Sequence, residues 1–588
     1  MTELSRGARS GPTFRPTSRF RLGPALSSIP VLAWLFLIVV LPNLLLIGTS
    51  FLQTSSGLIA FEPTLKNYAR MLNSAGFWML LGRTLILSFA GCVLATLIAY
   101  PLAFYVGRIS RRSKALLTIL IVLPLWIGLL MRVFAWRVIL GQSGVLNAAL
   151  VSSGLLDEPS SAFLYSPLSV VIVFAYYSVP FIFIATMGAF EKIPQDLFES
   201  SQDSGATAWQ TFRHMVWPLT RRNLAIGFSL AFLVTVGDFV TPAMIGGIDG
   251  TTVGVLISSQ FGTANNWPYG AAVAVTLMLA VTLLLGLVLA LAPAKGVVIG
   301  GEADQATLSP ARPAARRLGA FGFAAVIVYL YLPLAIVVLF SFNAANLQTF
   351  PLQGFSLQWY AGIVQDQSLI DAVKRSLLVA FCVVAVSVTV GTAFALIIFY
   401  TKLKGARTYE LLFALPIATP GVVLGIEMVL GTAILGIPSG VTRVVIGQMS
   451  FAMPVTMLLL LVRLRRLDPS LIEASLDLGA NHWQSFTHIL LPLIGGTIAA
   501  GAFLSLTLSA DDVMVTMFLT GGEPTLPIWV FNQMRFGFTP TVNAIFAILI
   551  AAILTLVSIA TLYAKTKNRT EEARRGISCE PTRRKSLL

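Results

Sequence analysis

The chain has 588 residues, of which 56% are hydrophobic and 11% are charged, and its net charge is +15. Charged residues make up about a quarter of an ordinary soluble domain, so this composition excludes a soluble globular protein. Apolar runs of about 20 residues, each long enough to cross roughly 30 Å of hydrocarbon, recur along the whole length. We therefore expect an all-α membrane protein.

The apolar runs divide into two sets and predict about twelve membrane spans. The first set lies near residues 28–50, 80–106, 114–140, 162–190, 222–246 and 268–292. The second set lies near residues 317–342, 373–400, 408–435, 445–464, 495–520 and 541–565. Gly and Pro interrupt four of these runs and predict broken or kinked helices there: at Leu123–Pro124, Tyr177–Pro180, Leu415–Pro416 and Thr419–Gly421.

The composition between the two sets marks a division of the chain into two units. A weakly apolar stretch rich in Pro, Ala and Gly separates them and is long enough to join two membrane domains. We predict an N-terminal tail over 1–27, a first transmembrane domain over 28–292, a linker over 293–316, a second transmembrane domain over 317–565 and a C-terminal tail over 566–588.

The positive charge alone would suggest nucleic-acid binding, but its distribution indicates membrane orientation instead. Most of the 40 Lys and Arg residues fall in the two tails, the linker and the loops on one side of the predicted spans. Lys and Arg collect in cytoplasmic loops. We therefore expect a multi-pass protein of the bacterial inner membrane with both termini in the cytoplasm. The three cysteines, Cys92, Cys382 and Cys579, predict no disulfide framework.

One polar segment occurs twice on the predicted cytoplasmic side. Both copies share a Glu, a Gly, a Trp and a Pro at the same spacing: Glu199, Gly205, Trp209 and Pro218, and Glu473, Gly479, Trp483 and Pro492. The Gly can end a helix in the left-handed conformation. Thr207 or Asn481 can then cap a second helix, with Gln210 or Gln484 completing a capping box.

A short capped helix with an aromatic stripe suits docking into a groove of a soluble partner. The alternative for each copy is an amphipathic helix that lies on the inner leaflet. The chain contains no Gly-x-x-x-x-Gly-Lys-Ser/Thr loop, so we expect a separate subunit to supply ATP hydrolysis. The three histidines, His214, His482 and His488, lack ligand spacing. We predict no metal, no cofactor and no catalytic site.

Ionisable residues inside membrane spans are costly, and each is a candidate for the transport pathway. Asp238, Asp511 and Asp512 lie at matching places in the two units and would favour a cationic solute. The alternative is that they cap helix ends or pair with Arg132, Arg137 or Arg535. Trp126 and Tyr177 could offer aromatic faces to an amine. Glu427 is either a further pathway residue or a packed, paired group.

The repeated segments and their flanks resemble a known family. The pattern Glu-Ala-(Ala/Ser)-x-x-x-Gly followed by Pro is similar to the EAA loop of ABC importer permeases, although Ser200 and Ser201 replace alanines in the first copy. Residues 132–136, 237–242 and 266–272 resemble the first permease of spermidine/putrescine-type importers. Residues 354–360, 511–513, 525–529 and 535–540 resemble the second permease. The chain resembles the two permeases fused in order, from about residue 28 to 565.

The resemblance implies two parallel six-helix repeats of the type I (MetI-like) importer fold. It also implies a transport subunit that receives a small solute from a periplasmic binding protein. The expected cargo is a polyamine or related organic cation, and ferric iron, phosphonate, thiamine and opine are the alternatives. The coupling residues would be those of the repeated segment, Glu199, Gly205, Trp209, Glu473, Gly479 and Trp483, docked on two copies of a cytoplasmic ATPase. A self-sufficient secondary transporter remains the rival hypothesis.

Overall fold

A computed structural model describes residues 24–55, 58–109, 114–291, 313–346, 348, 350–401, 406–468, 470–536, 540–555 and 558. Most of the two predicted tails and of the predicted linker, together with Cys579, lies outside these residues. By length and composition, ten described helices can cross a membrane, or eleven if one bent pair counts as a single span. This agrees with the all-α membrane fold predicted from the apolar runs.

The first half contains the elements up to residue 291. Its long helices are α1–η1–α2 (Pro24–Trp34, Leu35–Val40, Leu41–Ser50), α4 (Ala75–Phe104), α8 (Pro167–Glu191), α11 (Trp217–Gly237) and α13 (Trp267–Leu291). Its shorter helices are α3 (Lys66–Leu72), α5 (Lys114–Val122), α6 (Leu129–Leu140), α7 (Val145–Ser152), α9 (Gln195–Asp203), α10 (Ala208–Thr211) and α12 (Val253–Phe261). Strands β1 (Gln53–Ser55) and β2 (Leu58–Ala60) pair antiparallel, with Gln53 opposite Ala60.

The second half repeats this order without the hairpin. Its long helices are α14 (Pro313–Phe340), α16 (Gln367–Thr401), α19 (Val441–Leu464) and α22 (Leu491–Asp511). Its shorter helices are α15 (Gln358–Gln365), α17 (Ala406–Ala418), α18 (Gly421–Ile434), α20 (Ser470–Asp477), α21 (His482–Ser485), α23 (Thr516–Leu519) and α24 (Leu526–Phe536). A last apolar helix covers Thr541–Thr555.

Proline and glycine shape the spans that differ most from the predicted ranges. The interruption predicted at Leu123–Pro124 in the run over 114–140 is confirmed: a 3-10 turn over Leu123–Trp126 ends α5, and α6 starts afresh at Leu129. The run predicted over 408–435 is a helix pair bent by 106° at Thr419–Pro420, because Pro420 has no N–H to continue the helix. The span predicted over 222–246 ends at Gly237. At Pro180 a break or a kink was predicted; α8 runs through this residue, so the helix is not broken there.

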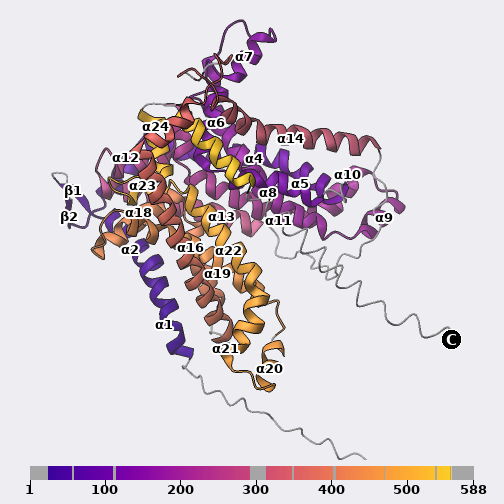
Figure 1. The fold of residues 1–588 in the computed structure, drawn as a ribbon, viewed down its shortest axis with the longest axis vertical. Coiled ribbons are helices and arrows are strands. Elements are labelled where there is room, and N and C mark those ends of the chain that lie inside the picture. Colours follow the sequence, from indigo (N-terminus) through magenta and orange to yellow (C-terminus); the bar gives the residue numbers. More distant parts are fainter. Residues whose placement is uncertain are drawn as a thin grey trace, which may run out of the picture.

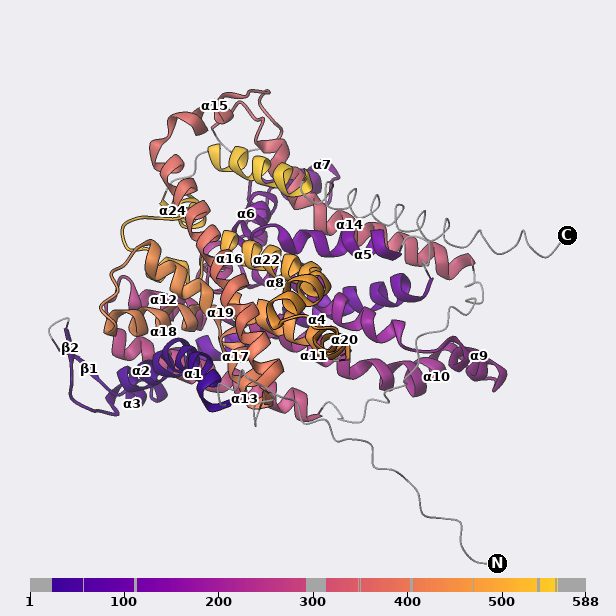
Figure 2. The ribbon, with the colours of Figure 1, turned by 60° about the horizontal axis from the view of Figure 1, so that its bottom comes forward.

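The first span of each half packs on the opposite half. Trp34 of α1 stacks on Phe413 of α17, with ring centroids 5.0 Å apart. In the other direction, the Tyr329 hydroxyl of α14 donates to the Ile172 carbonyl of α8 at 2.8 Å. Figure 2 shows α14 alongside α5 and α6, and α1 and α2 beside α17 and α18. The two halves are therefore joined by exchanged helices as well as by their central contacts.

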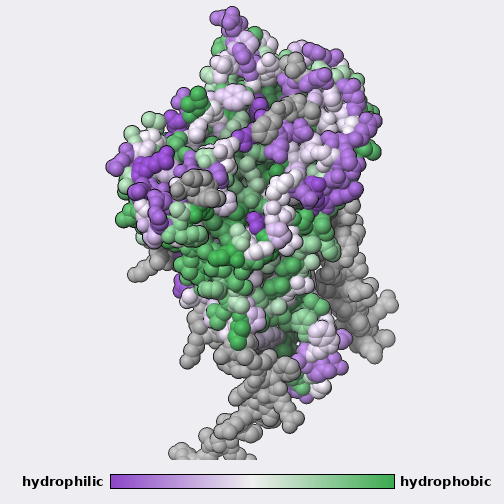
Figure 3. Space-filling view, turned by 90° about the vertical axis from the view of Figure 1, so that its left-hand side faces the viewer, coloured by the Kyte–Doolittle hydropathy of each residue, from purple (hydrophilic) through white to green (hydrophobic). Residues whose placement is uncertain are grey.

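The helices of the two halves diverge toward one end of the molecule. In Figure 1, the first half extends toward α9 and α10, the second half extends toward α20 and α21, and these two tips lie far apart. The halves meet near α6, α18, α23 and α24. Figure 3 shows a broad band of hydrophobic side chains bordered by hydrophilic ones, as expected of a surface that faces hydrocarbon.

Candidate functional site

The two repeated segments form the same helix–turn–helix element, and we call α9–α10 and α20–α21 the coupling elements. Gly205 has φ +74° and Gly479 has φ +88°, the left-handed conformation that only glycine adopts without strain. The next helix begins with a complete capping box in each copy, Thr207 with Gln210 and Asn481 with Gln484. These caps confirm the local structure predicted from the sequence.

The coupling elements present exposed aromatic side chains. Trp209 is 65% exposed and Trp483 is 70% exposed, although both are large apolar groups. Each lies against a phenylalanine of the same helix, Phe212 at 5.5 Å and Phe486 at 5.6 Å between ring centroids. Glu199 and Glu473 are exposed as well. The three predicted coupling residues of each half thus lie together on one coupling element. The two elements form separate tips of the molecule, and no described residue of the chain covers them.

A pair of hydroxyl groups ties the two helices of each coupling element together. The Ser201 hydroxyl lies 2.7 Å from the Thr211 hydroxyl, and the Ser475 hydroxyl lies 2.7 Å from the Ser485 hydroxyl. These residues hold equivalent positions in the two copies, since Ser201 and Ser475 each follow the shared Glu by two. Sequence reasoning treated Ser201 only as a departure from alanine. The recurrence of a hydroxyl at both positions was the signal that it missed.

An ion pair lies close to each coupling element along the chain. The acidic and basic residues of this pair have exchanged places between the two halves. In the first half, Lys114 of α5 lies 2.8 Å from Glu191, the last residue of α8. In the second half, Arg465, which directly follows α19, binds Glu410 of α17. The hydrogen bond from Arg465 to Glu410 raises the pKa of Arg465. Each pair joins the helix that leads into a coupling element to the helix that leads toward the centre.

Asp238 and Asp512 both cap the element that follows them. Asp238 accepts hydrogen bonds from the backbone N–H groups of Val240 at 2.8 Å and Thr241 at 3.0 Å, from the Thr241 hydroxyl and from the Tyr177 hydroxyl at 3.0 Å. Asp512 accepts from the N–H groups of Val515 at 3.3 Å and Thr516 at 2.9 Å, and from the Thr516 hydroxyl at 2.6 Å. The helix-capping alternative thus describes their contacts, and their role in the pathway stays a prediction.

Asp511 makes a contact between the two halves. Its carboxylate accepts from the Leu129 backbone N–H at 2.6 Å and so caps α6. It also lies against Gly128, where an added Cβ would be 2.3 Å from the carboxylate oxygen. Arg132, one turn into α6, is buried and donates from Nε to the Gly128 carbonyl at 3.3 Å. Its guanidinium carbon lies 5.9 Å from the centre of the Tyr177 ring.

The pseudo-equivalent contact between α11 and α18 carries no charge. Gly237 is the last residue of α11, as Asp511 is the last residue of α22. Gly421 is the first residue of α18, as Leu129 is the first residue of α6. An added Cβ on Gly237 would lie 2.9 Å from the Gly421 nitrogen, so backbone meets backbone here. Leu424 is the fourth residue of α18, as Arg132 is of α6. The two halves therefore meet through one charged and one uncharged contact.

The other candidate residues lie around this centre. Trp126, at the break before α6, packs edge-on against Phe503 of α22, with ring centroids 5.1 Å apart. Tyr177 is buried and holds Asp238 through its hydroxyl. Among the described residues, Arg137 forms no ion pair with an aspartate and instead donates to the Met534 carbonyl at 2.8 Å.

Glu427 faces a different neighbour from the three aspartates. It is buried in α18, and one carboxylate oxygen accepts from the Asn43 amide of α2 at 3.2 Å. The other oxygen has no hydrogen-bond partner among the described residues. Gly431, one turn further along α18, lies against Pro42 of α2. Glu427 is therefore packed against the exchanged first span, as one of the two alternatives for it expected.

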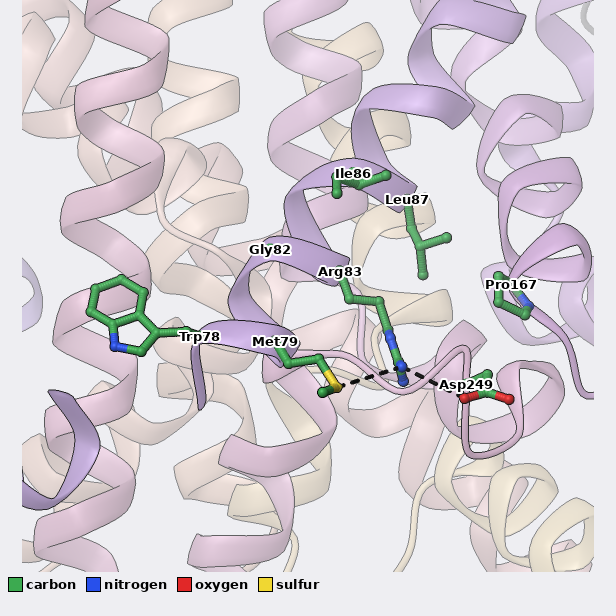
Figure 4. A pocket seen from close by; sticks show the side chains of 8 residues that line it. All are labelled: Trp78, Met79, Gly82, Arg83, Ile86, Leu87, Pro167 and Asp249. Carbon is green, nitrogen blue, oxygen red and sulfur yellow. Dashed lines mark hydrogen bonds and ion pairs between the residues drawn. The ribbon is translucent and has the colours of Figure 1, made fainter. Parts of the chain in front are cut away.

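The end opposite the coupling elements carries one arginine clamp in each half. Arg83 donates to the Ile248 carbonyl at 2.9 Å and lies 3.6 Å from Asp249. Arg375 donates to the Pro524 carbonyl at 2.9 Å and lies 3.6 Å from Glu523. Each clamp fixes the loop that follows the central contact. Figure 4 shows the first clamp in an open, mostly apolar groove on α4, with Trp78, Met79 and Ile86.

Comparisons with known proteins agree with this duplicated architecture. Residues 91–297 and residues 387–567 each match the family described as "Binding-protein-dependent transport system inner membrane component". The chain is 33% identical over 256 residues to the "Spermidine/putrescine transport system permease protein PotB" of Haemophilus influenzae, covering 43% of this chain and 89% of that protein. It is 31% identical over 246 residues to the "Spermidine/putrescine transport system permease protein PotC" of Escherichia coli, covering 42% of this chain and 93% of that protein.

A solved structure gives a weaker match. One chain of the "bacterial alginate ABC transporter in complex with alginate pentasaccharide-bound periplasmic protein" has 17% sequence identity and a TM-score of 0.36. The match covers 44% of this chain and 90% of that chain.

Proposed function

This chain belongs to the family of binding-protein-dependent transport system inner membrane components, and on that premise we propose how it couples to its partners and what it carries. It is a permease component of an ABC importer, a transport subunit rather than an enzyme. The proposal extends this to the docking of the ATPase, the conformational cycle and the cargo.

The observation that carries the proposal is the pair of matched coupling elements. Trp209 and Trp483 are exposed on short, capped helices whose turns and hydroxyl bridges are equivalent. Two such surfaces suit two equal grooves, so two copies of one cytoplasmic ATPase bind the chain, one at each element. The termini and the coupling elements then lie in the cytoplasm, in agreement with the positions of the Lys and Arg residues.

The divergence of the two halves supports an inward-facing state. The coupling elements lie far apart, whereas Asp511 and Leu129 are in hydrogen-bond contact near the opposite end. ATP binding would close the ATPase dimer and draw α9–α10 toward α20–α21. The same movement would separate the central contacts and open the pathway to the outside, where a periplasmic binding protein releases its solute. This is alternating access through rigid-body motion of the two halves.

A polyamine or another small organic cation is the proposed cargo. Two features support it: the names of the similar permeases, and the three carboxylates and the Tyr177 ring that gather near the central contacts. Carboxylates and aromatic faces both attract ammonium groups. Ferric iron, phosphonate, thiamine and opines are the alternative cargoes, and an anionic solute would need a different binding group.

The test is reconstitution of the chain in vesicles with its ATPase and its binding protein. We expect ATP-dependent uptake of radiolabelled putrescine or spermidine, and no uptake when the ATPase is left out. Uphill accumulation by the chain alone would contradict the docking proposal and favour a secondary transporter. Thermal stabilisation of the binding protein by a panel of amines, phosphonates and metals would identify the cargo independently of the transport assay.

A further inference from the structure

The groove on α4 has no part in the proposed transport cycle, yet it has the volume of a ligand site. Its volume is about 530 Å³, within the range of small-molecule clefts. Large apolar side chains along it are exposed: Trp78 by 50%, Met79 by 60% and Ile86 by 67%. On a membrane span, an exposed apolar surface faces hydrocarbon. The groove is lined on α4 by Trp78, Met79, Gly82, Ile86 and Leu87, and on α8 by Pro167 (Figure 4).

Two arginines show at what depth in the bilayer the groove lies. Arg108, at the far end of the same span, lies 4.2 Å from the centre of the Phe198 ring of the first coupling element. At 1.5 Å per residue, the stretch from Arg83 to Arg108 spans roughly 37 Å. The hydrocarbon core is roughly 30 Å thick, so the two guanidinium groups lie at opposite headgroup layers. Ile86 and Leu87, one turn closer to the bilayer centre, then lie at the edge of the hydrocarbon.

The groove also presents two opposite charges at headgroup depth. Arg83 is held by the Ile248 carbonyl, to which Nη1 donates at 2.9 Å. Its Nη2 lies 3.6 Å from the Asp249 carboxylate, which is longer than a hydrogen bond. The Asp249 side chain is 79% exposed, and an ion pair this open to solvent is weak. Each of the two charges is therefore available to a further partner of opposite sign.

We infer that the groove binds a zwitterionic aminophospholipid, of the phosphatidylethanolamine class, from the leaflet opposite the coupling elements. The lipid phosphate accepts from the Arg83 guanidinium, and the lipid ammonium pairs with the Asp249 carboxylate. An acyl chain lies along Ile86 and Leu87. An anionic phospholipid without an amine brings a second negative charge to Asp249 and binds less tightly. The inference rests on the proposed function in one respect only, which is that this leaflet is the outer one.

The second half provides a matched comparison. Its clamp has the same charges, since Arg375 lies 3.6 Å from Glu523. Asp371 and Lys374 stand where the first half has Met79 and Gly82, and they form an ion pair of 3.7 Å. At Gly82, by contrast, an added Cβ would meet no protein atom within 4 Å. The first clamp thus lies over an apolar surface with room for an acyl chain, and the second lies beside charged side chains.

The test is quenching of Trp78 fluorescence in the full-length chain, purified in non-ionic micelles. The probe is phosphatidylethanolamine with brominated acyl chains, and the Trp78 signal is the difference between the chain and Trp78→Phe. We expect the probe to quench Trp78. Unbrominated phosphatidylethanolamine should compete about fivefold better than phosphatidylglycerol with the same chains. Absence of Trp78 quenching overturns the lipid site, and equal competition by the two lipids overturns the headgroup assignment.

Three variants localise the site. Gly82→Leu fills the groove without meeting protein atoms, so the fold is kept and the quenching of Trp78 should be lost. Asp249→Asn should leave the lipid bound but make phosphatidylglycerol compete as well as phosphatidylethanolamine. Glu523→Gln, the matched change at the second clamp, should alter neither result. Unchanged quenching in Gly82→Leu, or the same loss of lipid preference in Glu523→Gln, overturns the inference.

Failure of this inference is distinguishable from failure of the proposed function, because the quenching is measured without ATPase, binding protein or cargo. A chain that imports amines with its partners but shows no quenching of Trp78 overturns the lipid site alone. A chain that shows the expected quenching and lipid preference supports the site, whatever solute it imports.

Discussion

The coupling elements and the central contacts have kept the twofold repeat to different extents. At the coupling elements, the glycine turn, the capping box, the contact between Trp and Phe and the hydroxyl bridge all occur in both copies. At the centre, one contact holds the Asp511 carboxylate at the Leu129 N–H, at the start of α6, whereas the other brings Gly237 against the backbone of Gly421. The helices at the centre still correspond between the two halves, but the residues in contact there differ.

This difference follows from what each region has to recognise. Two copies of one partner impose the same surface on both coupling elements. A small solute that passes the centre contacts both halves at once, and nothing requires the two sides of its route to be alike. The predictions below test whether the coupling elements are equivalent and whether the central contacts are not.

The largest effect is expected from Gly479→Pro. Gly479 has φ +88°, and the proline ring fixes φ near −65°, so the turn of the coupling element cannot form. ATP-dependent uptake should fall to background, and Gly205→Pro should have the same effect because the turns are equivalent. Membrane insertion should be unchanged, as followed by the amount of protein in the membrane fraction. Gly495→Ala, at a position on α22 with open space around it, serves as the control and should keep normal uptake. Normal uptake by Gly479→Pro would refute the docking role of the coupling element.

The next largest effect concerns the charged central contact. Asp511→Ala removes the carboxylate that accepts from the Leu129 N–H and so removes the cap of α6. We expect a loss of about 2 kcal/mol in the free energy of unfolding, measured by denaturant titration in micelles. Asp511→Asn, which keeps an acceptor for the Leu129 N–H, should lose less. If both variants are as stable as the wild type, the Asp511 carboxylate does not contribute to the free energy of unfolding.

Smaller effects are expected at the hydroxyl bridges. Ser475 is buried, and removing its hydroxyl leaves that of Ser485 with fewer partners, so Ser475→Ala should cost about 1–2 kcal/mol. Ser201 is only partly buried, and Ser201→Ala should cost less than 1 kcal/mol by the same argument. Thermal melting of the purified chain measures both. Ser200→Ala, at an exposed neighbouring position, should melt like the wild type; an equal drop in all three variants would show that the bridges are not the cause.

The smallest effect is expected at the ion pairs Lys114–Glu191 and Glu410–Arg465, whose acidic and basic residues have exchanged places between the two halves. Glu191→Arg places like charges at Lys114 and should lower the melting temperature slightly, since a partly exposed pair contributes about 0.5 kcal/mol. Adding Lys114→Glu recreates the polarity that Glu410 and Arg465 have in the second half. We expect this double variant to regain the wild-type melting temperature and uptake. If it stays as impaired as the single variant, the two halves are not interchangeable at this position.

The parts of the structure that depend on neighbouring residues could be predicted from the sequence. The spans followed from apolar runs, and the capping boxes of the coupling elements followed from Thr207 and Asn481 with their glutamines. The break at Pro420 was anticipated as a kink, although not the 106° angle of the bent pair. The end of α5 was anticipated at Leu123–Pro124, whereas the end of α11 was missed because apolar residues continue past Gly237.

The parts that depend on contacts between distant residues could not be predicted in this way. Nothing near Asp511 in the sequence indicates that its carboxylate caps a helix of the other half. The bonds of Asp238 to the N–H groups of Val240 and Thr241 are local, but its bond to Tyr177 joins the end of α11 to α8. The packing of Asn43 on Glu427 likewise requires the first span to lie on the second half. Such contacts follow from the three-dimensional arrangement of the spans.

The exchange of first spans has a consequence for how the chain is made. The helix α1–η1–α2 leaves the ribosome before any other span, yet its packing partners, such as Phe394 and Phe413, are synthesised several hundred residues later. Of its contacts, those with α13 of the first half can form earlier, whereas those with α16 and α17 must wait until the second half has been inserted. Completion of the first span's packing therefore depends on the insertion of a distant part of the chain.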